Sequence, residues 1–373
     1  MENSFVHLHA HTEYSMLDGA AKIEPFLNRI LELEQPGAAI TDHGNLYGAL
    51  EFYNSAIEKK LKPIIGYEAY VISDSRFERP DRKNNKRYHL TLLAENTVGY
   101  WNLVEMASKA FTEGYYYKPR IDYELLKKYS EGIIALSGCL GGEIAQLLAP
   151  DGSVEEGNQG QTRSFDDALK KAEFYQSIFG ENNFFIELHK HGIKQQEDIL
   201  PDLLKISEKL SAPLVAANDS HYVHSDDASA HDALLCVQTN ATLDDENRFK
   251  FDGSGFYIKS SEEMRDLFPN EEFPNACNNT LKILDRVEYE FEKDTYYLPD
   301  FPIDDSNKNV DEYLKDKVYQ GAEGLYGELT SELEERINYE LEVIESMGFA
   351  SYFLIVGDLI NYAKSNGIRT GAG

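Results

Sequence analysis

The stretch Phe5-Val6-His7-Leu8-His9-Ala10-His11 alternates apolar residues with histidines, as the end of a buried strand does. In an extended segment, side chains at every second position share a face, so His9 and His11 can bind a single cation. His7 shares that face, and its role stays open between a metal ligand and a residue that orients a ligand or supports the fold. Three of the ten histidines lie in this stretch, which makes an accidental surface cluster a poor explanation.

Other short apolar runs also lead into polar residues or Gly-containing turns. Helical patterns separate these runs, and strands that alternate with helices indicate a parallel sheet or a barrel. In an α/β barrel the strand ends carry the chemistry, and ligands spread over many strand ends favour a closed ring over an open sheet. The candidate side chains supply nitrogen, thiolate and carboxylate donors, which suit zinc or manganese and not calcium: His43, Glu68, His89, Cys139, Asp219 and His221.

The helical patterns identify the residues that should face the core. Leu46, Leu50, Tyr53 and Ile57 recur at helical spacing, and we expect them to form the buried face of one helix. Further along, Glu187, His189 and His191 are spaced like a metal pattern, but we interpret them as structural residues.

The composition indicates a folded protein. The length of 373 residues suggests two or three domains, which is enough for a substantial core, and the 42% hydrophobic content excludes a disordered acidic chain. Three cysteines are too few for a disulfide framework and fit a reducing cytoplasm, and no apolar run reaches the length of a membrane span. With 36 Lys and Arg against 65 Asp and Glu, the formal net charge is −29, which taken alone argues against a simple nucleic-acid binder.

Six stretches of the sequence carry a family resemblance. They are FVHLHAHTEYSMLDGA (5–20), AITDHGNLYGALEFYNSA (39–56), KPIIGYEAY (62–70), YHLTLLAEN (88–96), GIIALSGCLGGE (132–143) and ANDSHYV (217–223). In this order they resemble the polymerase-and-histidinol-phosphatase (PHP) domain at the start of the replicative, C-family DNA polymerase III alpha subunits of bacteria. The stretches RFKFDGSGFYIKS (248–260) and GFASYFLIVGDLINYAKSNGIRTGAG (348–373) resemble the same family.

The resemblance implies a fold and an activity. The fold is a distorted (β/α)7 barrel that holds three divalent metal ions, with Zn2+ expected and Mn2+ or Fe2+ as alternatives. The implied activity is a 3′–5′ proofreading exonuclease that hydrolyses DNA phosphodiesters through a metal-activated hydroxide. Every ligand position of the family has a matching residue type here, and the implied metal-binding and catalytic residues are His9, His11, Asp18, His43, Glu68, His89, Cys139, Asp219 and His221.

The resemblance also divides the chain. Residues 1–288 are expected to be the PHP exonuclease domain, and residues 289–373 a linker followed by the N-terminal part of an α/β polymerase palm. The sequence stops at Gly371-Ala372-Gly373, where the phosphate-binding stretch of the palm would begin and where Ala372 stands in place of the usual Pro. We therefore expect a truncated palm without its catalytic aspartates.

The implied partners are those of a replicative polymerase. They are DNA at the primer 3′ end, the remainder of the polymerase chain, the sliding clamp and its loader, and a separate proofreading exonuclease. Mg2+ would serve the full-length polymerase. We expect a cytoplasmic location and no membrane partner.

A basic segment stands out in this acidic chain. Between residues 76 and 87 the only acids are Glu78 and Asp81, and the segment leads directly to His89. We hypothesise that it guides the DNA strand to the metal ions through phosphate contacts, with a solvated flexible loop as the alternative. The residues concerned are Arg76, Arg79, Arg82, Lys83, Lys86 and Arg87.

Two other functions stay open from the sequence. A stand-alone PHP phosphoesterase acting on a small phosphorylated metabolite would use the same cluster, although residues 290–373 have no evident use in such an enzyme. A metal-stabilised scaffold for the polymerase would need the ligands but no turnover, because metal binding can serve folding alone.

Overall fold

The computed structural model describes residues 3–81, 84–150, 162–251, 253, 255–291, 297–303 and 308–371. The chain divides into two units, residues 1–290 and residues 291–373. The functional boundary expected after residue 288 concerns the roles of these units, and it stays a prediction.

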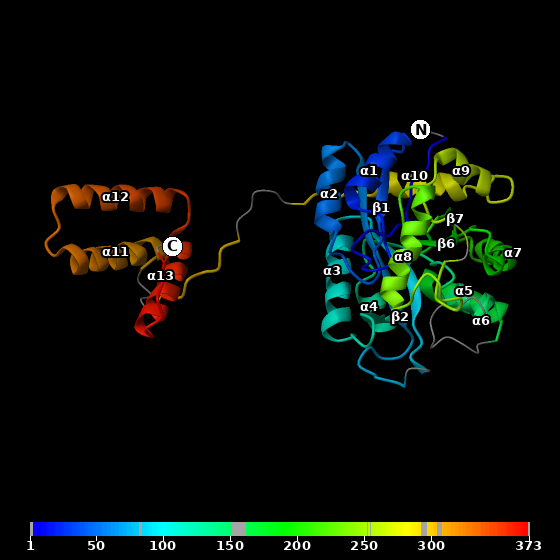
Figure 1. The fold of residues 1–373 in the computed structure, drawn as a ribbon, viewed down its shortest axis with the longest axis horizontal. Helices are drawn as coiled ribbons and strands as arrows, with labels where there is room; N and C mark the ends of the chain where they lie inside the picture. Colours follow the sequence, from blue (N-terminus) through cyan, green and yellow to red (C-terminus); the bar gives the residue numbers. More distant parts are fainter. Residues whose placement is uncertain are drawn as a thin grey trace. The chain divides into compact units, whose positions relative to one another are not determined.

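A seven-stranded sheet runs through the first unit (Figure 1). Its strands follow the order β1-β2-β3-β5-β6-β7, with β4 paired to β2. The predicted α/β architecture is confirmed, but the sheet is not wholly parallel, because β3 runs antiparallel to both β2 and β5. The strands are β1 (Gly37–Ile40), β2 (Lys62–Ile72), β3 (Tyr88–Ala94), β4 (Arg120–Asp122), β5 (Ile133–Leu136), β6 (Phe184–Leu188) and β7 (Leu214–Ala216).

The N-terminal segment joins the two ends of the strand path. His7 forms a bridge with β1, and Ala10 forms a bridge with Ser220, which follows β7. The backbone N–H of His11 donates to the Ser220 carbonyl at 2.8 Å, and the Ser220 N–H donates to the His9 carbonyl at 3.2 Å. The path therefore closes through this segment, as the sequence-based preference for a ring expects.

One face of the sheet is apolar at one end and polar at the other. Ile64, Leu93 and Val215 belong to an apolar cluster on this face, and helix α10 (Ala276–Arg286) packs against the cluster. Because side chains alternate between faces along a strand, Glu68 shares the face with Ile64, and His89 shares it with Leu93. The alternation therefore places candidate ligands above an apolar floor.

Helices cover the outer face of the sheet. In Figure 1, α2 and α3 lie on one side of the strands and α6 and α7 on the other. The larger apolar core lies between the strands and helices that include α3, α6 and α7. The remaining helices of this unit are α1 (Ile23–Glu32), α2 (Ala49–Glu58), α3 (Thr97–Thr112), α4 (Tyr123–Lys128), α5 (Glu143–Leu148), α6 (Phe165–Phe179), α7 (Lys194–Leu210), the short 3-10 helix η4 (Ser225–Asp227), α8 (Ala228–Thr239) and α9 (Ser261–Leu267).

The buried face of α2 differs from the predicted one. Leu50 and Ile57 are exposed, while Phe52 and Ala56 are fully buried. Tyr53 is the member of the predicted stripe that α2 does bury. The prediction was wrong because two apolar stripes overlap on α2, and helical spacing alone does not show which of them faces the sheet.

The second unit contains three helices in its described part: α11 (Val310–Tyr326), α12 (Ser331–Ser346) and α13 (Ala350–Ser365). Leu314, Ala350 and Leu354 form a small apolar cluster, against which Leu341 and Ile344 of α12 pack. No strand occurs among residues 297–303 and 308–371, so only helices represent the expected α/β palm there.

The described helices differ from a membrane span in length or in apolar character. Taken singly, none of them is both long and apolar enough to cross a bilayer. The pair α12 and α13 meets the requirement of length and composition only when the two are joined, and they are bent by 115° relative to each other.

The corrected face of α2 leads to a stability prediction. Phe52→Ala should lower the free energy of unfolding by about 3–5 kcal/mol, because it leaves a cavity in the core. The matched change Leu50→Ala, at a side chain 56% exposed on the same helix, should alter it by about 0.5 kcal/mol or less. Urea unfolding monitored by circular dichroism measures both, and equal losses would contradict the assignment of the buried face.

Candidate metal centre

The structure brings all nine predicted ligands to one end of the first unit. Each comes from the end of a strand or from the segment beside it, except that Glu68 lies inside β2. The other positions are the N-terminal segment for His9, His11 and Asp18, the turn after β1 for His43, the start of β3 for His89, the turn after β5 for Cys139, and the segment after β7 for Asp219 and His221.

Glu68 lies at the centre of this group. Its Oε2 is 2.5 Å from His43 Nδ1, and its Oε1 is 3.0 Å from His89 Nδ1. The same Oε1 lies 3.3 Å from His9 Nε2 and 3.6 Å from the Cys139 sulfur. One buried carboxylate therefore contacts four of the other predicted ligands.

Two aspartates complete the connections. Asp219 Oδ1 lies 3.0 Å from His11 Nε2 and 3.5 Å from His9 Nε2. Asp18 reaches the other side of the group, with Oδ2 at 3.1 Å from His43 Nε2 and Oδ1 at 3.8 Å from His221 Nε2. All nine side chains are thus linked through three carboxylates.

A cavity of about 350 Å³ opens over the group. His9 and His11 are fully buried and lie outside its lining, so they form the deep part of the site. The predicted ligands that line the cavity are Asp18, His43, Glu68, His89, Cys139, Asp219 and His221. A substrate in this cavity would therefore meet the ligands directly.

The charges in the site are strongly coupled. Burial, together with His43 and His221, lowers the pKa of His11 to about 3. Burial also opposes protonation of His43, but Tyr70 and Glu68 outweigh it and raise the pKa of His43. At Glu68 burial favours the neutral acid, but the neighbouring histidines outweigh it and hold the pKa well below its usual range. Ionised carboxylates thus face histidines that divide between neutral and protonated forms.

Several donor atoms of the predicted ligands lie close to one another but form no hydrogen bond within the protein. Nε2 of His9, Nε2 of His11 and Oδ1 of Asp219 are buried and make no hydrogen bond. Unsatisfied buried polar atoms are costly, and a divalent ion among these donors would satisfy them. Three sets of predicted ligands have donor atoms within 4.8 Å of one another: His9 with His11 and Asp219, His11 with His43 and His221, and Glu68 with His89 and Cys139. The residues therefore fit bound divalent metal ions.

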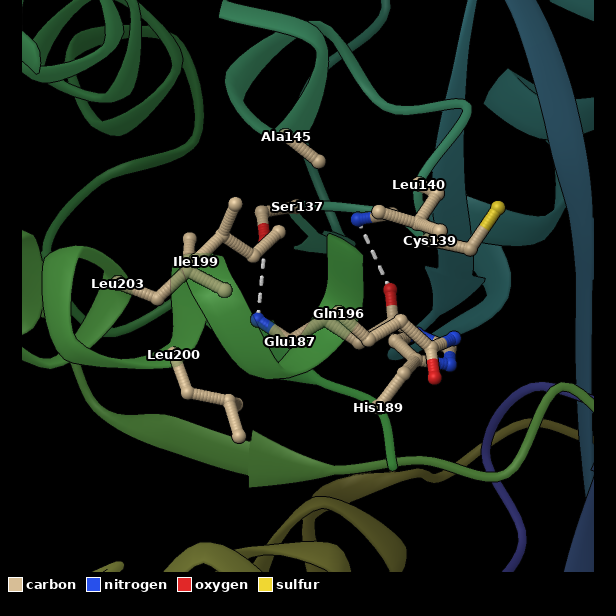
Figure 2. Close-up of a pocket in the computed structure, with 11 residues that line it drawn as sticks. Ser137, Cys139, Leu140, Ala145, Glu187, His189, Gln196, Ile199, Leu200 and Leu203 are labelled. Atoms are coloured by element: carbon tan, nitrogen blue, oxygen red, sulfur yellow. Dashed lines mark hydrogen bonds and ion pairs between the residues drawn. The ribbon is translucent and has the colours of Figure 1, made fainter. Parts of the chain in front are cut away.

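Glu187 belongs to the site although the sequence interpretation made it structural. Its Oε1 lies 2.6 Å from His9 Nδ1 and 3.1 Å from His189 Nε2, and its Oε2 accepts a hydrogen bond from the Gly138 N–H at 2.9 Å. Figure 2 shows Glu187 between His189 and the loop that carries Cys139. Burial opposes the shift, but His9 and His189 lower the pKa of Glu187 to about 2.

This contact gives Glu187 a defined role. A carboxylate that accepts the Nδ1–H of His9 fixes the tautomer in which Nε2 carries the lone pair, and Nε2 faces Glu68 and Asp219. His9, Glu187 and His189 also form a further set of donors within 4.8 Å. The spacing of residues 187–191 was the available signal in the sequence, but it could not show that His9 of the N-terminal segment is the partner of Glu187.

Asp42 is a second residue that the sequence did not identify. It accepts hydrogen bonds from the Thr12 N–H at 2.6 Å, the Thr12 hydroxyl at 2.8 Å and the Ser15 hydroxyl at 2.7 Å. Ser15 in turn lies 3.2 Å from His11 Nδ1. Asp42 therefore holds the turn between His11 and Asp18.

The open question about His7 is resolved by its contacts. Its Nε2 lies 2.9 Å from the Lys259 carbonyl oxygen, and its ring packs against Phe5. Burial lowers the pKa of His7 to about 4. These contacts involve none of the predicted ligands, so they indicate that His7 supports the fold.

Comparison with known proteins places this geometry in a family. A family model for the PHP domain matches residues 7–191, and a model described as the bacterial DNA polymerase III alpha NTPase domain matches residues 312–373. Proteins named DNA polymerase III subunit alpha are similar over 99% of this chain, with 43% identity for Borreliella burgdorferi, 44% for Saccharopolyspora erythraea and 40% for Treponema pallidum. The chain belongs to the DNA polymerase III alpha family. It corresponds to the N-terminal segment, with the PHP domain and the start of the NTPase region.

The chain is shorter than its relatives in this polymerase III alpha family. The matches cover 31%, 32% and 30% of the three proteins, so the chain spans about a third of their length. The activity, substrates and partners of the whole polymerase are therefore matters for proposal.

The basic segment of this polymerase III alpha chain is partly structural. Arg76 is buried, and its guanidinium contacts Asp122 at 3.0 Å and Glu113 at 2.6 Å. Arg79 donates to backbone carbonyls, including that of Glu113 at 3.0 Å. The proposed phosphate contact is wrong for Arg76, because its charge is already satisfied by carboxylates. Lys86 is exposed and Arg87 half-buried, so for them the hypothesis stays a prediction, while Arg82 and Lys83 lie outside the described residues.

The role of Glu187 can be tested by metal affinity. Glu187→Gln should weaken zinc binding by about 10- to 100-fold, because the amide holds the His9 ring less firmly and makes it less basic. Competition with a chromogenic chelator measures the dissociation constant. Glu197→Gln, at an exposed position on α7, is the matched control and should leave the affinity unchanged. Equal zinc affinities for both variants would contradict the proposed role of Glu187 in orienting His9.

The thiol of Cys139 leads to a pH prediction. Burial, with Glu68 and Asp219, raises the pKa of Cys139, so the metal-free protein carries a protonated thiol at neutral pH. Zinc binding must release this proton, and lower pH should therefore weaken the binding. Cys139→Ser should release about one proton fewer per protein than the unchanged chain. Calorimetry at pH 7 in two buffers of different ionisation enthalpy measures the release, and equal proton counts would exclude the thiolate as a ligand.

Proposed function

We propose that this chain acts as a metal-dependent 3′–5′ exonuclease, the proofreading part of a replicative polymerase. The observation that carries the proposal is a cavity lined by histidine, carboxylate and thiol donors, with the buried His9 and His11 in contact with two of the lining carboxylates. A phosphodiester resists hydrolysis strongly, and bound divalent ions supply the Lewis acidity and the lowered water pKa that such a reaction needs. Three ions with Zn2+ as the expected species, or Mn2+ or Fe2+, form part of the proposal.

The residues of the chain prepare the site for an anionic substrate. Asp18, Glu68, Asp219 and the Cys139 thiolate contribute four negative charges, whereas three divalent ions contribute six positive ones. The loaded site would be locally cationic within a chain of net charge −29. Glu68 orients His43 and His89, and the buried His9 and His11 exclude water from the deep side.

The family context extends the proposal to the whole polymerase. The substrate would be the primer 3′ end, and the partners the remainder of the polymerase chain, the sliding clamp and clamp loader, and a separate proofreading exonuclease. Residues 1–288 would form the exonuclease domain, and residues 289–373 the linker and the first part of the palm. Mg2+ would serve nucleotide addition in the complete polymerase, and the location would be the cytoplasm.

The proposal predicts nucleotide release from a mismatched primer. The chain should shorten a primer with a mispaired 3′ end, while His43→Ala and Asp219→Asn should lower the rate at least about 100-fold, because each removes a metal ligand. Gel analysis of a 5′-labelled primer measures the release, with Glu197→Gln as the surface control. Equal activity of all variants would indicate a contaminating nuclease. Zinc binding without any release would support the scaffold function, and release of phosphate only from small metabolites would support the phosphoesterase.

A further inference from the structure

The cavity over the candidate metal centre has an aromatic wall that the metal chemistry does not use. Phe249, Phe251 and Phe256 line it together with the predicted ligands. Lys250 also lines it, and among the described lining residues it is the one Lys or Arg. The wall comes from the segment between α8 and α9, far in the sequence from most of the ligands.

The three phenylalanines differ in their packing. Phe256 is buried, and Phe251 is half-buried with its ring edge-on to His221 at 4.8 Å and to Phe256 at 4.7 Å between centroids. Phe251 therefore braces a predicted ligand. Phe249 is 40% exposed, and among described rings it meets Phe251 alone, at 5.9 Å and 82°. Phe249 thus places a large apolar side chain beside a highly polar site.

An exposed aromatic ring next to a cationic group and a phosphate-binding centre matches one chemical class. Single-stranded nucleic acids are held by aromatic side chains that stack on bases and by cations that contact the backbone. Stacking tolerates any sequence because every base has a π-face, and a proofreading site must accept all four bases. A small phosphorylated metabolite without a ring would leave Phe249 without a partner.

We propose that Phe249 stacks on the terminal base of a single-stranded DNA 3′ end, while Lys250 contacts a backbone phosphate. This inference rests on the proposed exonuclease function and identifies the part of the same site that recognises the substrate. It explains why the aromatic wall and the ligands share one cavity, since the scissile phosphate lies next to the base that is removed.

The test measures DNA binding rather than cleavage. The probe is a 5′-fluorescein-labelled single-stranded oligonucleotide whose last linkage is a phosphorothioate, and fluorescence anisotropy gives its dissociation constant for the zinc-loaded chain. Phe249→Ala should weaken binding about 5- to 150-fold, the range found when a stacking residue is truncated. Phe249→Trp should retain the affinity of the unchanged chain, and Phe249→Leu, which keeps the apolar bulk but not the π-face, should behave like the alanine variant.

A second probe separates stacking from a merely structural role. An oligonucleotide with an abasic 3′-terminal nucleotide should bind the unchanged chain about as weakly as the intact oligonucleotide binds Phe249→Ala. Phe249→Ala itself should bind the abasic and the intact oligonucleotides with nearly equal affinity. An abasic nucleotide at the 5′ end should have no effect. Phe111→Ala, at a ring of similar exposure (38%) on α3 and outside the cavity lining, is the matched control. An equal loss on the abasic probe in the unchanged chain and in Phe249→Ala would overturn the proposal.

The role of Lys250 can be tested by the salt dependence of DNA binding. Lys250→Gln should make the dependence of log affinity on log salt concentration shallower by about 0.7, the value for one phosphate contact on a single strand. Lys209→Gln, at an exposed position on α7, should leave the slope unchanged. Equal slopes for the two variants would exclude the phosphate contact.

The binding assay and the nuclease assay test the two proposals separately. Affinity that depends on the 3′ base without nucleotide release would refute the proposed exonuclease while supporting the base-binding wall. Release of nucleotides without any dependence of binding on the 3′ base would refute the proposed role of Phe249 in base binding, but it would still support the proposed exonuclease.

Discussion

Glu68 is a carboxylate in the middle of a fully paired strand, and it is 1% exposed. An ionised carboxylate at such a position is unfavourable unless charged or hydrogen-bonding partners surround it. His43, His89 and His9 supply that compensation from three other segments of the chain. The turn after β1, the start of β3 and the N-terminal segment are thus held together by one buried group, and the shape of the cavity follows from it.

The sequence predicted the chemistry of the site better than its geometry. The family resemblance selected nine side chains that do meet in space, and the pattern of residues at strand ends had singled out all of them except Asp18. The direction of β3 was not predictable from alternation alone, and it matters because His89 begins its strand whereas Glu68 lies well along its own. An antiparallel neighbour places the start of one strand beside the end of another, so His89 reaches the site from the opposite chain direction.

Supporting residues were harder to predict than candidate ligands. Asp42 and Glu187 are carboxylates whose roles depend on partners more than 25 residues away in sequence, at Thr12 and His9 respectively. Locally, only the spacing of residues 187–191 sets Glu187 apart from a solvated acid, and no such signal marks Asp42. The same limit applies to α2, where two overlapping apolar stripes differ only in which one the sheet covers. It applies also to the buried Arg76, whose carboxylate partners Asp122 and Glu113 compensate the charge that the sequence suggests is free.

The segment that closes the strand path carries the earliest residues of the chain, yet it pairs with residues that follow β7. His9 and His11 leave the ribosome more than 200 residues before Asp219 and His221. During synthesis, His9 and His11 are therefore present long before Asp219. The contacts that close the strand path are also among those with the longest sequence separation, and such contacts form slowly. Until then these histidines lack the carboxylate that lies beside them in the folded site, so a metal ion bound during synthesis would meet a different set of donors from one bound by the finished site.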